Sequence, residues 1–175
     1  MYPSATGTSM PIRRCRSARH APLKNGPAEK SITGSVSIQG DATSGGAGFT
    51  RGVALYGSDV LAASGGITLA ATAGELRTDT RGVSVGYKAG SAVTASSSDV
   101  VLRADSISLT SALDVASTGT LTVEPTATSF SSALAFPISN LSLSTGPTGL
   151  SGLTLGKSGN TADISIDAAL GIAGP

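Results

Sequence analysis

Two carboxylates near the C-terminus are the side chains that could most readily act as an acid–base pair. Asp163 and Asp167 flank Ile164-Ser165-Ile166. Four residues along a strand separate two side chains by roughly 13 Å, at about 3.3 Å per residue, whereas glycosidases hold their two carboxyl groups roughly 5–9.5 Å apart. Because Ile164 and Ile166 alternate with the polar residues, we expect both Asp side chains to face solvent rather than to form a catalytic pair.

Three other aspartates, Asp99, Asp105 and Asp114, could meet if their strands were stacked about 4.8 Å apart. The sequence does not fix that register, so an enzyme acting on polysaccharide along a β-helix stays open as an alternative. Polysaccharide clefts usually also present exposed aromatic side chains. Beyond residue 30 the chain contains only Phe49, Tyr56, Tyr87, Phe130 and Phe136.

The remaining reactive residues form no recognisable site. His20 is the only histidine and Cys15 the only cysteine, which excludes an internal disulfide and a zinc site built from cysteines. A phosphate-binding loop needs Gly, four residues and then Gly-Lys-Ser/Thr. Ser151 occupies the first of these positions before Gly156-Lys157-Ser158, so we interpret this segment as a strand ending in a Gly-Lys turn.

The segment 45–49 (GGAGF) resembles half of a calcium-binding nonapeptide but lacks the Asp ligand. We therefore predict no catalytic residue, no cofactor-binding residue, no metal ligand and no cofactor. The chain is predicted not to be an enzyme.

Short strands of alternating apolar and polar residues must position these side chains. They recur every 11 to 24 residues, and no segment has a convincing helical pattern. The units are SVSIQG at Ser35, GVALYG at Gly52, GITLAA at Gly66, GVSVGY at Gly82, SISLTS at Ser106, GTLTVE at Gly119, LSLSTG at Leu141, then Leu153–Leu155 and Ile164–Ile166. A strand-sized unit that returns at this interval predicts a coiled array of β-rungs.

Composition agrees with a narrow β-stack. Hydrophobic residues make up 39% of the chain, but only 3% are aromatic, none is Trp, and 23 residues are Gly. We predict parallel ladders whose inward side chains are Ile67, Leu69, Val83, Val85, Ile107, Leu109, Leu121, Val123, Leu153, Leu155, Ile164 and Ile166. An antiparallel β-sandwich is the alternative, which the absence of Asn-Gly or Asp-Gly hairpin turns from residues 31–175 disfavours.

The charge distribution divides the chain into two parts. Residues 1–30 contain six Lys or Arg against Glu29 alone and have no periodicity, so we predict a disordered basic leader there and a β-solenoid over 31–175. The solenoid part is mildly acidic, which argues against a nucleic-acid partner. Pro125 and Pro137 predict a looser rung or an excursion over 125–140. No apolar run is long enough for a transmembrane helix, and no signal peptide is visible.

The strand units and the segment GLTLGKSGNTADISIDAALGIAGP at 152–175 resemble repeats of filamentous-haemagglutinin-like adhesins and of autotransporter or two-partner secretion passengers. This resemblance covers about residues 31–175. It implies a right-handed parallel β-helix at the cell surface, the outer membrane or outside the cell. The implied partner is a glycan or protein on a host or bacterial surface, bound without catalysis.

The chain lacks the secretion domain and the C-terminal barrel of that family, so the sequence is interpreted as a fragment or shortened reading frame. A fragment without a function of its own is therefore a further alternative. A solenoid needs polar caps at its ends, yet the segment 168–173 (AALGIA) is apolar. We therefore expect the chain to associate end to end.

Overall fold

The computed structural model describes residues 34–41, 51–57, 59–62, 64–79, 82–89, 92–94, 96–143 and 149–167, which form strands and connecting turns without a helix. The predicted leader at 1–30, the calcium-like segment at 45–49 and the apolar segment at 168–173 lie outside these residues. The predicted all-β class is confirmed over the described ranges.

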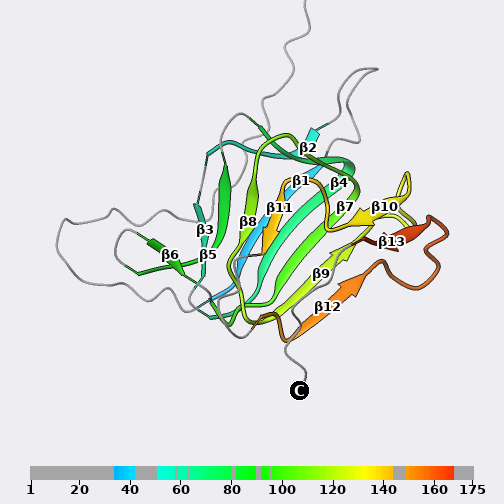
Figure 1. The fold of residues 1–175 in the computed structure, drawn as a ribbon. Coiled ribbons are helices and arrows are strands. Elements are labelled where there is room, and N and C mark those ends of the chain that lie inside the picture. The colour runs from blue at the N-terminus through cyan, green and yellow to red at the C-terminus, as the bar shows by residue number, and fades with distance from the viewer. Residues whose placement is uncertain are drawn as a thin grey trace, which may run out of the picture.

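Five of the six parallel strands of the main sheet lie side by side in the order in which the chain makes them (Figure 1). They are β1 (Val36–Asp41), β4 (Ile67–Thr78), β7 (Val100–Leu109), β9 (Thr120–Glu124) and β12 (Gly152–Leu155). β4 and β7 are long strands, and the second half of β4 also pairs in parallel with β2 (Arg51–Leu55).

A second parallel sheet covers the inner face of the first. Its strands are β3 (Asp59–Leu61), β5 (Val83–Ala89), β8 (Leu113–Val115) and β11 (Leu141–Leu143), again in chain order. One short antiparallel strand, β6 (Ala92–Thr94), is added to this sheet beside β5, whereas β10 (Leu134–Phe136) and β13 (Ile164–Ile166) form a separate parallel pair. The chain therefore returns repeatedly to the same sheet in the same direction, which makes the fold a parallel β-solenoid and rejects the antiparallel sandwich.

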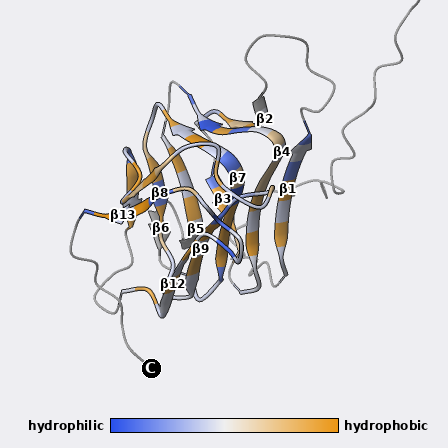
Figure 2. Ribbon diagram, turned by 90° about the vertical axis from the view of Figure 1, so that its right-hand side faces the viewer, coloured by the Kyte–Doolittle hydropathy of each residue, from blue (hydrophilic) through white to orange (hydrophobic). Residues whose placement is uncertain are grey.

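Strand register explains why the sequence folds this way. The pairings align Val36, Ile67, Val100, Leu121 and Leu153 in one column across the main sheet. Two residues further along, Ile38, Leu69, Leu102, Val123 and Leu155 form a second column. Because side chains alternate between the two faces of a strand, a shift of one residue would expose a whole column. The alternation is visible as orange and pale bands along the strands in Figure 2.

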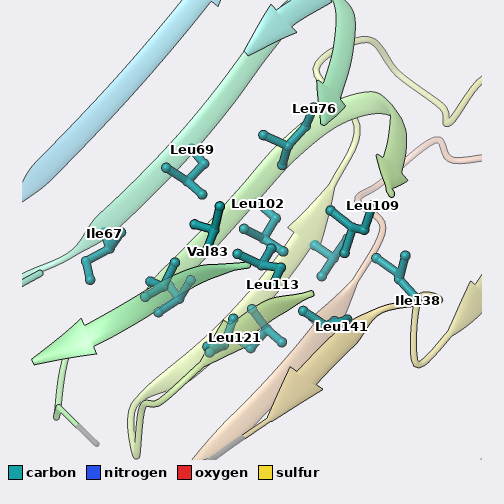
Figure 3. Packing of buried hydrophobic residues seen from close by; sticks show 14 of the residues in the cluster. Ile67, Leu69, Leu76, Val83, Leu102, Leu109, Leu113, Leu121, Ile138 and Leu141 are labelled. Carbon is teal, nitrogen blue, oxygen red and sulfur yellow. The ribbon is translucent and has the colours of Figure 1, made fainter. Parts of the chain in front are cut away.

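The hydrophobic core lies between the two sheets, where side chains of both interdigitate (Figure 3). Of the predicted inward residues, Ile67, Leu69, Val83, Val85, Leu109, Leu121 and Val123 are buried. Another four are partly buried and pack against the core: Ile107, Leu153, Leu155 and Ile164. These predictions are confirmed.

The prediction for Ile166 is wrong, because its side chain is 60% exposed. Ile166 pairs in register with Phe136, which is fully buried. β13 is the last strand of the described chain and pairs only with β10 there. Ile166 therefore occupies the position in register with an inward residue, but it lies on a terminal rung and its side chain stays largely exposed.

The Pro-containing segment leaves the main sheet, as predicted. Residues 126–129 form bends instead of strand, and β10 then pairs only with β13. This excursion is nevertheless tied to the next rung. The amide of Phe130 and the hydroxyl of Ser129 donate to Asn160 Oδ1 at 3.1 and 3.0 Å, and Ser129 Oγ accepts from the Ala162 amide at 3.0 Å.

One corner of the solenoid is closed by buried serines. Ser96, Ser98 and Ser117 are all nearly inaccessible, and Ser96 bridges Ser117 in parallel. Ser117 Oγ donates to the carbonyls of Ser98 and Ser96 and accepts from the Gly119 amide at 3.0 Å. These bonds satisfy backbone groups of two successive rungs in a place where no regular ladder runs.

Candidate functional site

An open depression on the outer surface is the best candidate for a binding site. Its volume is about 370 Å³ and its lining residues are Ala73, Gly74, Glu75, Asp105, Ser106 and Ser131. The depression lies where β4 and β7 turn from their first to their second half. The register between these strands breaks between Ala71 and Glu75, so β4 bulges there. Ala73 in the bulge has φ 49°, a left-handed conformation that is unfavourable for a residue with a Cβ.

Hydrogen bonds hold Asp105 in the floor of this depression. Its Oδ1 accepts from the Ala127 amide at 2.7 Å, and its backbone carbonyl accepts from the Ser131 amide and hydroxyl at 2.8 and 2.9 Å. The excursion after β9 therefore forms one wall. Glu75 comes from the neighbouring rung, with Oε2 3.9 Å from Arg77 Nη1. The depression thus offers two carboxylates and the Ser131 oxygen as hydrogen-bond acceptors, and the Ser106 hydroxyl as a donor or acceptor, to a polar ligand.

The structure does not gather the three aspartates considered from the sequence. Asp105 lines the depression, whereas Asp99 is bonded to the amide and hydroxyl of Thr120. Asp114 lies on the outer face of the second sheet, in a column with Asp59, Ser84 and Ser142. The second carboxylate in the depression, beside Asp105, is instead Glu75, which the sequence analysis did not predict. The alternation of Glu75-Leu76-Arg77-Thr78, with Leu76 and Thr78 buried, could have placed Glu75 on the outer face.

Asp163 and Asp167 are both exposed, as predicted from their alternation with isoleucine. Ser165 Oγ donates to Asp167 Oδ2 at 3.3 Å. The strand ending in a Gly-Lys turn is also confirmed. β12 ends at Leu155, Gly156 follows with φ 76°, and Lys157 Nζ donates to the carbonyl of Thr126 at 2.9 Å.

The outer face of the main sheet is polar and regular. One outward column contains Ser37, Thr68, Val101, Thr122 and Thr154. Beside it, Arg103 forms a two-point contact with Glu124 on the next rung, with Nε 2.6 Å from Oε1. Arg103 and Glu124 are paired strand residues, so this ion pair follows from the register of β7 and β9.

Asp99 gives the solenoid an expected pH dependence. The Thr120 hydroxyl and amide both donate to this carboxylate and lower its pKa below the ordinary value of 3.8. A depressed pKa adds stability that is complete above the unfolded-state value and is lost as the pH falls through the folded-state value. We expect the stability difference between the wild type and Asp99→Asn to shrink as the pH is lowered below 3.8.

Thermal melts of both proteins between neutral and acidic pH measure this difference. Thr120→Val removes the hydroxyl donor and keeps the amide, so its loss of stability should be smaller and should fade over the same pH range. A constant difference between wild type and Asp99→Asn at every pH would contradict the assignment.

Aromatic side chains contribute little to the described surface. Phe130 and Phe136 are buried, and Tyr56 is half exposed directly after β2. Phe49 and the side chain of Tyr87 lie outside what the structure describes. A ligand in the depression would therefore be held by hydrogen bonds more than by stacking on these rings.

Within the described ranges, no helix has the length and apolar character needed to cross a membrane. The same residues contain no group of three or more His, Cys, Asp or Glu side chains that could hold a metal ion.

No protein-family model matches the chain, and neither a curated protein nor a solved structure is significantly similar to it.

Proposed function

We propose that this chain is a non-enzymatic segment of a secreted or surface-exposed bacterial adhesin-like protein. It presents a β-solenoid surface to a glycan or protein on a cell. The β-solenoid supports this proposal because it exposes long rows of Ser and Thr without needing a catalytic centre. The observation that carries the proposal is the depression between Glu75 and Asp105, the site where polar groups from successive rungs converge.

The chemistry of the depression favours a neutral glycan. Carboxylates accept hydrogen bonds strongly from sugar hydroxyls, and the Ser106 hydroxyl can donate in return. The Ser131 hydroxyl donates to the Asp105 carbonyl, so it can only accept from a ligand. Two carboxylates would repel an acidic sugar, because like charges at short range are unfavourable. The Ala127 amide and the Ser131 contacts fix Asp105 in advance, so little conformational freedom is lost on binding.

The same pair of carboxylates favours one second candidate, an enzyme that cleaves polysaccharide. Glu75 and Asp105 come from adjacent rungs and line one open depression, as the two acids of a glycosidase must. The non-enzymatic proposal remains the better supported one. The depression is open, and the described aromatic residues do not form a platform that would hold a chain across it.

A glycan panel followed by titration calorimetry tests both candidates. We expect binding of a neutral oligosaccharide to weaken by about 10-fold or more in Glu75→Gln and in Asp105→Asn, because each removes a charged hydrogen-bond acceptor. The matched control is Glu124→Gln, a carboxylate paired with Arg103 away from the depression, which should bind like the wild type.

Each other outcome selects an alternative. Release of new reducing ends, lost in Glu75→Gln and Asp105→Asn, would establish the enzyme. Binding that is equally strong in all variants would place the ligand elsewhere on the solenoid. A wild-type chain that binds neither glycans nor cells would favour a fragment without independent function.

A further inference from the structure

The main sheet has two terminal strands whose outer edges pair with no described residue. β1 pairs only with β4, and β12 pairs only with β9. The Val36 amide donates to the carbonyl of Gly66 at 2.8 Å, so by alternation the Ser37 amide points away from β4. At the other end, the Gly156 amide donates to the carbonyl of Val123 at 2.8 Å. The amides of Leu153 and Leu155 therefore point away from β9.

The inward columns of the main sheet are also incomplete at both ends. Their middle members Ile67, Leu69, Val100, Leu102, Leu121 and Val123 are all 0% exposed. The end members Val36 and Ile38 on β1, and Leu153 and Leu155 on β12, are only partly buried. A further strand placed against either edge would bury them as the interior residues are buried.

The two edges have few of the features that normally prevent strand addition. Charged residues and proline commonly protect sheet edges, but β12 contains neither, and the single charged residue of β1 is Asp41 at its last position. Among the described residues, the two large hydrophobic side chains that are exposed lie on the first and last rungs. Ile166 on β13 is 60% exposed, and Tyr56 directly after β2 is 50% exposed. The apolar and hydrogen-bonding surfaces left open are thus at opposite ends of the solenoid.

We propose that β12 of one copy pairs in parallel with β1 of a second copy and continues the main sheet in its own register. Val36 of the second copy would lie over Leu153, Ser37 over Thr154, and Ile38 over Leu155. The Leu153 amide would donate to the Ser35 carbonyl of the second copy, as the Ile67 amide donates to the Asp99 carbonyl at 2.8 Å within the chain. The contact joins two different surfaces, so it leaves a free edge at each end and permits chains of copies.

Ser37→Pro tests the pairing at its hydrogen bonds. Proline lacks the amide that would reach the partner, and an edge strand tolerates proline where its amide faces outward. The matched control Ser37→Ala keeps the amide. In sedimentation velocity we expect the wild type and Ser37→Ala to form larger species as concentration rises, and Ser37→Pro to remain monomeric with a similar melting temperature.

Disulfide trapping tests the register and does not depend on how Ser37→Pro folds. In a Cys15→Ser background, Ser37→Cys is mixed with Thr154→Cys and oxidised. Paired strands lie about 4.8 Å apart, within the Cα separation of about 4.4–6.8 Å that a disulfide spans. We expect a crosslinked heterodimer in this mixture. In the control mixture of Gln39→Cys with Thr154→Cys, the two cysteines are displaced by two residues along the strand. This mixture should give several-fold less crosslinked heterodimer.

Three results would overturn the proposal. A wild-type chain that stays monomeric at all concentrations would mean that another segment, such as residues 1–33 or 168–175 of the same chain, occupies the edges. Equal crosslinking in both mixtures would reject the register. Oligomers that persist unchanged in a folded Ser37→Pro variant would place the contact elsewhere.

Discussion

Replacing Leu102 with Ala should lower the free energy of unfolding by about 3–5 kcal/mol, the cost of opening a cavity in a well-packed core. Leu102 is fully buried in the middle of its column, between Leu69 and Val123 on the neighbouring strands. Figure 3 shows it among side chains of both sheets. Urea denaturation followed by circular dichroism measures the change.

Leu155→Ala is the matched control, because Leu155 is the same residue type at the end of the same column. It is only partly buried, so the loss should be about 1–2 kcal/mol, the value of the smaller apolar area removed from water. Both variants are compared in a Ser37→Pro background, in which contacts between copies do not contribute. Equal losses of unfolding free energy for the two variants would contradict the assignment of Leu102 to the buried middle and Leu155 to the partly exposed end of one column.

Much of this fold could be predicted from the period of its hydrophobic residues. The alternation in GITLAA and GTLTVE predicted the start of β4 and the whole of β9. The expected residues of these segments point inward. The first half of β7 was missed, although Val100 and Leu102 alternate in the same way. The short strands β3 (Asp-Val-Leu) and β10 (Leu-Ala-Phe) were also missed, because neither has a polar residue between two apolar ones, as Ile164-Ser165-Ile166 of β13 has.

The depression could not be predicted, because it depends on the register between strands. Glu75 and Asp105 are far apart in the sequence and are brought together only by the pairing of β4 with β7 and by the bulge at Ala73. The exposure of Ile166 was missed for a related reason. Alternation indicates which way a side chain points, but burial also requires a neighbouring rung, and a local pattern does not contain that information.

Gly119→Ala should destabilise the protein by about 3 kcal/mol, through overpacking together with the loss of buried hydrogen bonds. A Cβ at Gly119 would lie 2.6 Å from the Ser98 carbonyl oxygen and 2.8 Å from its carbon, both backbone atoms that cannot rotate away. The rungs would have to separate at this corner. That movement would break the bonds that Ser117 Oγ donates to the carbonyls of Ser98 and Ser96 on the neighbouring rung.

Gly66→Ala supplies the comparison, because Gly66 directly precedes β4 just as Gly119 directly precedes β9. The nearest atoms to a Cβ at Gly66 are 3.9 Å away, an ordinary contact. Gly66→Ala should therefore be neutral, or stabilising by about 0.4–1 kcal/mol through the reduced freedom of the unfolded chain. Thermal and urea unfolding of both variants measure these two changes in stability. A Gly119→Ala protein as stable as Gly66→Ala would show that the serine-closed corner is not tightly packed, because the rungs there could separate without loss.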